Sequence, residues 1–412
     1  MFLNLTEPRV IEWLAQFVTA DQPVAENLLS NILTVGADDL IQGLREVIRT
    51  IADERPGPVA LYSERHIRHL KGRPNRLFKE TRTKQRRAHG NGPVPVPQGK
   101  PYARETGSEG VIATLITGLA RAEPKRFLDH PGPDAIRKNR VRSYVVVTDF
   151  IGSGRRARAN LEGAWQIGSF KSWRSLGHLR FAVAAFSGTV AGVREVERHR
   201  SGPKVRLYRG CPVIDDIESD AKEKIVDLCN RHAPRKLPND WTALGYGNAG
   251  ALIAFDHGIP NNAPLLLHTA RRNWIPLFPR RSSALFGSFR RTGMCPEKIA
   301  RSLRNLRHTR LARAPRFTGI AEHEQEMMLL LTALKRRPRW SLAVSARTGL
   351  SVVEVETMIK RARTDGYLDD ELRPTKAAYE AMTYLKTTDV PPTPLPKVPD
   401  ELYCPTSLRP PC

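Results

Sequence analysis

The feature that most constrains this chain is a short apolar run that ends in an acidic residue and a glycine-rich turn. Residues 145–147 are three valines and predict a buried strand, which Thr148 and Asp149 follow directly. Residues 152–154 read Gly-Ser-Gly and precede a segment compatible with a helix. A strand, a glycine loop and a helix form a phosphate cradle, because glycines let backbone N–H groups turn inward and the helix dipole favours an anion. The residues predicted to bind a phosphate or a nucleotide here are Gly152, Ser153, Gly154, Arg155 and Arg156.

The same stretch resembles the phosphoribosyl diphosphate loop of the type I phosphoribosyltransferases. That family has an apolar strand, two acids, two apolar residues, one variable residue, and then Thr or Ser with Gly. Asp149 matches one acid, whereas Thr148 replaces the other. The resemblance implies that Asp149 orients the ribose, that Thr148 offers only a hydroxyl, and that Mg²⁺ accompanies the diphosphate. Because one carboxylate is missing, we expect ligand binding with weak or absent transferase turnover; an ordinary loop of a Rossmann-like sheet is the alternative.

Three other polar loops adjoin predicted strands or helices. Residues 63–66 follow a predicted strand over residues 59–62 and form either a ligand site, since open α/β sheets bind ligands at such strand ends, or a surface turn. Residues 107–110 precede an amphipathic helix and form either a second anion cradle or a simple N-cap turn. Residues 256–262 follow a predicted strand over residues 251–255 and form either a ligand loop or a plain turn. The candidate residues of these loops are Ser63, Arg65, Ser108, Glu109, Gly110, Asp256, His257, Asn261 and Asn262.

Further apolar strands at residues 181–186 and 205–208 alternate with helical segments, which predicts a parallel sheet covered by helices on both faces. The segments DFIGSG, FDHGIPNN and WIPLFPR together resemble a phosphoribosyltransferase-like family of bacterial conflict (antiphage) operons, including retron operons. The resemblance covers about residues 56–282. It implies an effector or sensor role, with a reverse transcriptase or another defence-operon protein as a partner.

The charge of the chain limits the class of its partners. The 412 residues include 66 lysines and arginines against 42 acids, a net charge of +24. Such a field attracts polyanions, and nucleic acid is the partner that we expect. The five cysteines form no C-x-x-C pair, and no side-chain cluster in the sequence predicts a metal site. The sequence contains neither the apolar run of a signal peptide nor a membrane-spanning stretch, so we expect a cytoplasmic protein without membrane contact.

The carboxyl-terminal third combines a basic connector with a winged helix. Residues 296–316 predict one basic helix with arginines at a spacing of three, which either bind nucleic-acid phosphates or form a solvated linker. Residues 321–387 predict three helices, a small wing and a last helix. Winged helices read DNA or dock proteins, and the mixed charge of the third helix leaves both uses open. The residues predicted to bind nucleic acid are Arg301, Arg304, Arg307, Arg310, Arg313, Lys360, Arg361 and Arg363.

We therefore predict an α/β protein with a type I phosphoribosyltransferase-like parallel sheet, an N-terminal helical segment and a C-terminal winged helix-turn-helix. The predicted function is an effector or sensor that binds phosphoribosyl diphosphate or a related nucleotide and couples this ligand to nucleic acid. The alternative is a non-catalytic nucleic-acid-binding regulator or assembly subunit, such as of a retron complex. Residues 71–104 are expected to form a long loop or flap. The predicted parts are a helical segment (1–55), the phosphoribosyltransferase-like domain (56–282), an Arg-rich connector (283–320), the winged helix (321–387) and a Pro-rich tail (388–412).

Overall fold

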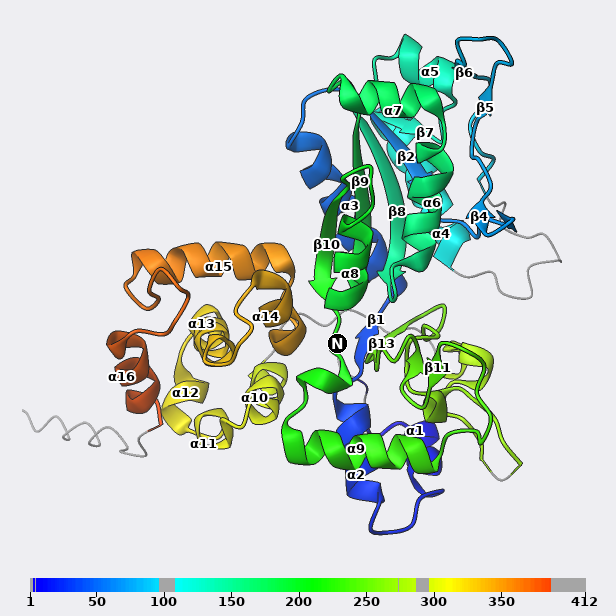
Figure 1. Cartoon of the computed structure of the whole chain (residues 1–412). Coiled ribbons are helices and arrows are strands. Elements are labelled where there is room, and N and C mark those ends of the chain that lie inside the picture. Colours follow the sequence, from blue (N-terminus) through cyan, green and yellow to red (C-terminus); the bar gives the residue numbers. More distant parts are fainter. Residues whose placement is uncertain (1–2, 4, 96–107, 273, 287–295, 387–412) are drawn as a thin grey trace, which may run out of the picture.

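A five-stranded parallel sheet forms the centre of the larger part of the chain (Figure 1). The computed structural model describes all residues except 1–2, 4, 96–107, 273, 287–295 and 387–412. The strand order is β10-β9-β8-β2-β7 and every pair is parallel, which confirms the predicted fold class. Four of these strands were predicted; β7 is only three residues long and has no β-branched residue that would indicate it. The strands are β2 (Val59–Ser63), β7 (Phe127–Asp129), β8 (Ser143–Ile151), β9 (Arg180–Gly188) and β10 (Lys204–Gly210).

Helices cover both faces of this sheet, as its almost continuous apolar strands require. α3 and α4 pack on one face, against side chains such as Leu61 and Val145. α6, α7 and α8 pack on the other face, against side chains such as Tyr144 and Val146. Neighbouring residues of β8 serve opposite faces because successive side chains of a strand alternate in direction. The helices of this unit are α3 (Ala37–Asp53), α4 (Ser108–Ala122), α5 (Pro133–Lys138), α6 (Arg155–Trp165), α7 (Gly168–Ser175) and α8 (Val190–Glu197).

The strand order contains a switch point between β2 and β8. The chain continues from β2 to β7 on one side, whereas β8, β9 and β10 follow one another on the other side. At such a point the loops at the carboxyl ends of the two central strands diverge, and ligands of open α/β sheets bind in the crevice between them. The fold therefore predicts a ligand site at the loops that follow Ser63 and Ile151.

The amino-terminal residues pack into the same body. α1, α2 and α9 share an apolar core with residues 252–278, and α3 packs on the main sheet. β1 pairs in parallel with β13 in a second, two-stranded sheet. The prediction of an all-helical segment over residues 1–55 is therefore wrong at β1, whose three residues are too few to show a strand period. The elements here are α1 (Pro8–Leu14), α2 (Gln22–Ser30), β1 (Leu33–Val35), α9 (Ser219–Arg231), β11 (Trp241–Thr242), β12 (Gly245–Tyr246), β13 (Ile253–Phe255) and short 3-10 turns at Ile214–Asp216, Leu265–Leu267, Pro279–Arg281 and Ala284–Phe286.

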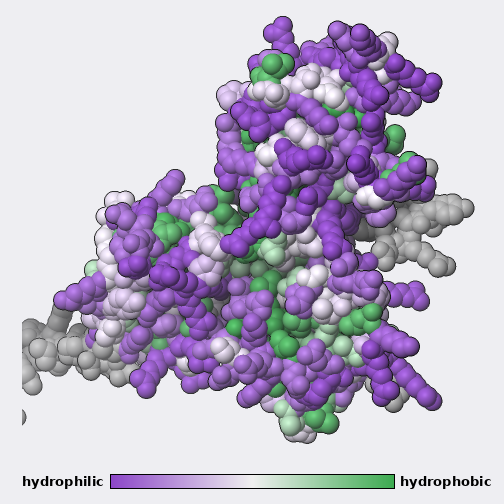
Figure 2. Space-filling model, in the orientation of Figure 1, coloured by the Kyte–Doolittle hydropathy of each residue, from purple (hydrophilic) through white to green (hydrophobic). Residues whose placement is uncertain are grey.

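Two small antiparallel hairpins replace most of the predicted loop over residues 71–104. β3 (His69–Leu70) pairs with β4 (Arg73–Pro74), and β5 (Lys79–Glu80) pairs with β6 (Ala88–His89). The end of the predicted loop, from residue 96, lies outside the described residues. Figure 2 shows that the upper part of the molecule, where these hairpins lie, has a mostly hydrophilic surface.

The carboxyl-terminal helices form a separate bundle with one apolar core, which includes the predicted connector. The single basic helix predicted over residues 296–316 is wrong, because the chain leaves the helix at Arg307, which has a φ of +62°. The predicted wing is confirmed by an antiparallel bridge between Leu368 and Pro374, and Ser351 and Glu354 form the predicted capping box. The Pro-rich tail lies outside the described residues. The helices are α10 (Pro296–Asn305), α11 (Thr309–Ala312), α12 (Pro315–Gly319), α13 (Glu322–Leu334), α14 (Ser341–Thr348), α15 (Val352–Thr364) and α16 (Lys376–Tyr384).

This bundle is docked on β10, an edge strand of the main sheet. The backbone N–H of Gly210 donates to Oγ of Ser345 over 2.9 Å. A Cβ on Gly210 would lie 2.3 Å from the carbonyl oxygen of Leu342, so the two backbones touch. The Arg194 guanidinium also lies over the ring of Trp340, 5.1 Å from its centroid. Across the described parts of the chain, no helix combines the length and the apolar character needed to span a membrane.

Candidate functional site

A cleft of about 760 Å³ opens at the carboxyl ends of β2 and β8, at the switch point of the sheet. It is lined by the loop between β8 and α6, by the first turn of α4 and by the loop after β13. Residues 280–282 complete the lining. Three loops that were predicted separately therefore contribute to one site.

The loop between β8 and α6 has the predicted strand–loop–helix geometry. Gly154 precedes α6 with a φ of +75°, where an L side chain would be strained. A Cβ on Gly152 would lie 1.9 Å from Oδ1 of Asn262, so a side chain here would displace the Asn262 amide, which donates to the Tyr246 carbonyl oxygen over 2.8 Å. The hydroxyl of Thr189 donates to the carbonyl oxygen of Gly152 over 2.6 Å. The loop is thus fixed, and no side chain caps the start of α6, where backbone N–H groups can receive an anion.

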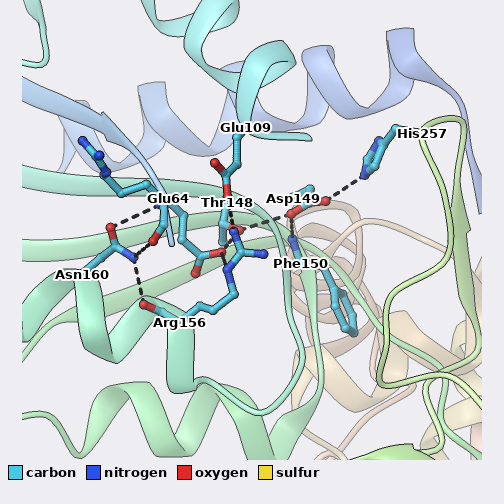
Figure 3. A network of polar contacts seen from close by, with 9 residues as sticks. Glu64, Glu109, Thr148, Asp149, Phe150, Arg156, Asn160 and His257 are labelled. Atoms are coloured by element: carbon cyan, nitrogen blue, oxygen red, sulfur yellow. Dashed lines mark hydrogen bonds and ion pairs between the residues drawn. The ribbon is translucent and has the colours of Figure 1, made fainter. Parts of the chain in front are cut away.

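Asp149 is held as an anion at the edge of this loop (Figure 3). Its Oδ2 lies 2.8 Å from Nε2 of His257, and its Oδ1 accepts the backbone N–H of Phe150 over 2.8 Å. Burial raises the pKa of Asp149, but hydrogen bonds from His257 and Ser108 and the charge of Arg156 outweigh burial and leave the pKa below its ordinary value. The structure therefore brings together Asp149, Ser108 and His257, all three of which were candidates from sequence.

Glu64 brings a second carboxylate into the cleft from the end of β2. The Thr148 hydroxyl donates to Oε2 of Glu64 over 3.0 Å and lies 3.2 Å from Oδ1 of Asp149. Nε of Arg156 lies 3.5 Å from the same oxygen of Glu64. Burial raises the pKa of Glu64 to about 7, in spite of the opposing charge of Arg156. This carboxyl group therefore titrates near neutral pH, unlike that of Asp149.

The two arginines that follow the glycine loop already have protein partners. Nη2 of Arg156 lies 2.5 Å from Oε1 of Glu109, so Arg156 connects Glu109 to Glu64 (Figure 3). Nη1 of Arg155 donates to Oδ2 of Asp240 over 2.8 Å. An anion at the loop would therefore rely first on backbone N–H groups and would share the arginines with these acids.

The remaining residues predicted from sequence divide into two groups. Gly110, Ser153, Asn261 and Asn262 line the cleft. Asp256 does not, because its Oδ2 accepts the backbone N–H of Ala37 over 2.7 Å at the start of α3.

Ser63 and Arg65, two further predicted site residues, also lie outside the cleft. Oγ of Ser63 lies 2.9 Å from Nε2 of His130 in a buried network away from the cleft. The Arg65 guanidinium donates to the carbonyl oxygen of Val94 over 3.2 Å. Neither Ser63 nor Arg65 lines the cleft, so the polar loop after β2 was correctly located but the wrong side chains were chosen.

Sequence reasoning missed Glu64 and the residue that positions it. The side-chain amide of Asn160, on α6, forms two hydrogen bonds with the backbone of Arg65. It accepts the Arg65 N–H over 3.2 Å and donates to the Arg65 carbonyl oxygen over 2.8 Å. This contact fixes the residue next to Glu64. A carboxylate within the strand-end loop over residues 63–66 was the available signal, whereas nothing local indicates the partner on α6.

The residues predicted to bind nucleic acid do not form one continuous exposed surface. Arg301 is half-buried, with Nη1 3.5 Å from the carbonyl oxygen of Leu3, and Arg307 forms an ion pair with Glu218. Arg307 is nevertheless exposed, and the other exposed members of the set are Arg304, Arg310, Arg313, Lys360, Arg361 and Arg363.

The sheet order, the glycine loop and the acidic residue at the switch point define a phosphoribosyltransferase-like domain. The sequence profile of the PRTase-CE family matches residues 10–280, and the chain belongs to this family. A profile described as wHTH-PRTase associated matches residues 328–410, which confirms the predicted combination with a winged helix. No curated protein and no solved structure matches the chain. The family match begins at residue 10, so the amino-terminal helices are part of this domain.

Proposed function

We propose that the cleft binds phosphoribosyl diphosphate or a related nucleotide. The 5′-phosphate would lie at the backbone N–H groups of residues 152–156, and the ribose hydroxyls would face Asp149. The observation that carries this proposal is the position of an ionised, hydrogen-bonded carboxylate beside an uncapped helix start at the switch point of the sheet. Charge-assisted hydrogen bonds of this kind bind ribose hydroxyls more strongly than neutral ones.

Glu64 offers a carboxylate close to Thr148, the position where the loop lacks one of the two family acids. The loop itself lacks one of the two family acids, yet a carboxylate from β2 lies 3.0 Å from the Thr148 hydroxyl. We propose that Glu64 supplies the second negative charge near the ribose. Ligand binding then does not require a second acid in the loop, and turnover becomes a separate question for experiment.

Mg²⁺ fits this arrangement as a companion of the diphosphate. The described residues contain no group of three or more metal-binding side chains. Mg²⁺ usually takes one or two carboxylates together with substrate phosphates and waters, so Glu64 and Asp149 suffice. Bound there, the ion would neutralise the charge of the diphosphate. The side chains of the cleft would orient the ribose and hold the phosphate.

Calorimetry with phosphoribosyl diphosphate and Mg²⁺ tests the binding proposal. Ribose 5-phosphate and pyrophosphate, titrated separately, show which end of the ligand is held. Asp149→Ala should weaken binding of the ribose-containing ligands, and Asp220→Ala, an exposed acid on α9, is the matched control. Absence of binding by folded protein, or equal binding by wild type and Asp149→Ala, would reject the proposed site. Pyrophosphate release across a panel of bases then measures turnover.

A second candidate function is a non-catalytic nucleic-acid-binding subunit that uses the connector and the winged helix. The exposed Arg304, Arg310 and Arg313 support it. The exposed start of α15 carries Glu354 and Glu356 instead, which repel phosphates. Charge reversal of the three arginines should flatten the salt dependence of nucleic-acid affinity if the connector is the binding surface.

The resemblance to conflict-operon proteins supports a cytoplasmic effector or sensor role in antiphage defence. A reverse transcriptase or another protein encoded nearby is the proposed partner. Phage plating on cells with wild-type or Asp149→Ala protein, combined with co-purification of the neighbouring gene products, tests this role. Equal protection by both proteins would show that defence does not depend on Asp149 in the cleft.

A further inference from the structure

The two hairpins over residues 69–89, which pack beside the end of α6 and the start of α7, form a basic surface. Residues 65–89 contain ten lysines and arginines and one acid, Glu80. Glu80 is turned inward, where its carboxylate accepts the backbone N–H of Gly168 over 2.7 Å. The hairpins are anchored as well: Gln166 donates to the carbonyl oxygen of Pro74 over 2.7 Å. This surface, which we call the hairpin surface, is therefore a fixed array of cations.

A groove of about 770 Å³ runs between the first hairpin and the exposed faces of α6 and α8. Its acids, Glu162 and Glu195, are already paired with Arg200 and Arg158. Within the described residues, no acidic side chain pairs with Arg73 or Lys171. The cations that line the groove are Arg73, Arg76, Arg155, Arg158, Lys171 and Arg200.

The groove adjoins the cleft at one shared residue. Arg155 lines both, at the point where the glycine loop becomes α6. Tyr246 lies at this junction, with the Arg155 guanidinium 5.3 Å from its ring centroid and Trp241 packed edge-on against it. Aromatic rings next to a cationic groove provide stacking surfaces for bases.

We propose that a single-stranded nucleic acid lies along this groove, with its terminal nucleotide at the cleft. The cations would contact successive phosphates, and Tyr246 would stack on a base near the strand end. The placement of the terminal nucleotide rests on the proposed function of the cleft, whereas the groove contacts do not. A duplex could not insert one nucleotide into the cleft without separating its strands, and an acidic peptide would leave the aromatic junction unused.

Fluorescence anisotropy with labelled 20-nucleotide RNA and DNA single strands tests this proposal on the full chain. Arg73→Glu/Lys171→Glu should lower affinity at least tenfold and reduce the slope of log K against log salt by about two. Lys224→Glu/Lys236→Glu makes the same charge change at exposed positions away from the groove and should reduce affinity much less. The groove variant should keep wild-type affinity for phosphoribosyl diphosphate, so a failure of the cleft proposal would be visible separately.

Several results would overturn the proposal. Equal affinity of wild type and the groove variant would place binding elsewhere, and equal losses in both double variants would show only a net-charge effect. Tighter binding of a duplex of the same length would exclude a single strand as the preferred ligand. Displacement of the strand by polyglutamate at equal charge concentration would instead assign the groove to an acidic protein.

Discussion

Oε2 of Glu64, the residue after β2, lies 3.0 Å from Oγ1 of Thr148 on the neighbouring strand β8. Thr148 occupies the position where the resembling family has an acid, and its hydroxyl is almost completely buried. The hydroxyl donates toward Glu64 and lies beside the carboxylate of Asp149. Thr148 therefore separates two carboxylates that would otherwise repel each other, which explains why an acid is unsuitable at this position.

The first prediction concerns Thr148→Asp, which restores the acid that the resembling family has at this position. The substitution should be unfavourable here, because a third carboxylate would adjoin those of Glu64 and Asp149. We expect thermal unfolding to show a loss of about 2 kcal/mol or more. The double variant Glu64→Gln/Thr148→Asp should recover most of this loss, since it restores the number of acids. If Thr148→Asp were as stable as wild type, the proposed repulsion would be wrong.

The second prediction concerns pH. Burial raises the pKa of Glu64 from 4.5 in the unfolded chain to about 7 in the folded protein. Between these values the folded state binds more protons, so the contribution of Glu64 to the free energy of unfolding falls as pH rises. The slope reaches at most about 1.4 kcal/mol per pH unit and vanishes above about pH 7. Glu64→Gln should lack this contribution, and denaturant titrations of both proteins between pH 4.5 and 8 measure the difference. Parallel stability curves would contradict the raised pKa.

Much of the site could be predicted because its signals are local. Residues 145–154 show a strand and a glycine loop within ten positions, and the loop after residue 255 was identified by its position at a strand end. Glu64 was missed because its surroundings come from two other elements, β8 and α6. Thr148 lies on β8, and Arg156 and Asn160 lie on α6, all far from Glu64 in sequence. No periodicity indicates such a meeting.

The errors in the carboxyl-terminal third have a different origin. The spacing of three between arginines indicated a basic stripe only if residues 296–316 remained helical. Arg307 adopts a φ of +62°, a conformation that sequence alone rarely reveals for a residue other than glycine or asparagine. Leu303, Leu306 and Leu311, on both sides of this break, all pack into the bundle core.

The third prediction concerns Gly152. Its Cβ position lies 1.9 Å from Oδ1 of Asn262, so Gly152→Ala must displace the Asn262 side chain, which lines the cleft and is hydrogen-bonded to Tyr246, or else shift the glycine loop. We expect at least a tenfold loss of affinity for phosphoribosyl diphosphate, with little change in overall helix content. Gly118→Ala is the matched control, since an added Cβ there meets no atom within 4 Å. Calorimetry and circular dichroism check the two variants, and unchanged affinity of Gly152→Ala would show that the loop is not the phosphate site.

The fourth prediction concerns His257. Its Nε2 lies 2.8 Å from Asp149, and its ring is stacked on Phe255 with centroids 5.0 Å apart. His257→Phe keeps the stacking but removes the hydrogen bond, so the pKa of Asp149 should rise toward its ordinary value. Ligand affinity should then fall more steeply as pH is lowered below 5 than it does in wild type. His257→Gln, which can still donate, should restore part of the affinity; identical pH profiles in all three proteins would deny His257 this role.

The last prediction concerns the attachment of the winged helix to the sheet. Gly210 permits contact between β10 and α14 because its Cβ position lies 2.3 Å from the Leu342 carbonyl oxygen and 2.8 Å from the Ala346 nitrogen. Both are backbone atoms, so Gly210→Ala cannot be relieved by a rotamer change and should destabilise the interface by about 1–3 kcal/mol. Ser345→Ala removes the hydrogen bond that Oγ accepts from Gly210 and the one that it donates to the Leu350 carbonyl oxygen over 2.6 Å, and should cost about 1–2 kcal/mol. Hydrogen exchange in α14 and β10 measures both effects, and the loss of protection should be larger for Gly210→Ala while β2 and β8 stay protected. Unchanged exchange in α14 would mean that the bundle is not held by this contact. Loss of protection throughout the sheet would mean that the docked bundle is part of the cooperative core of the protein.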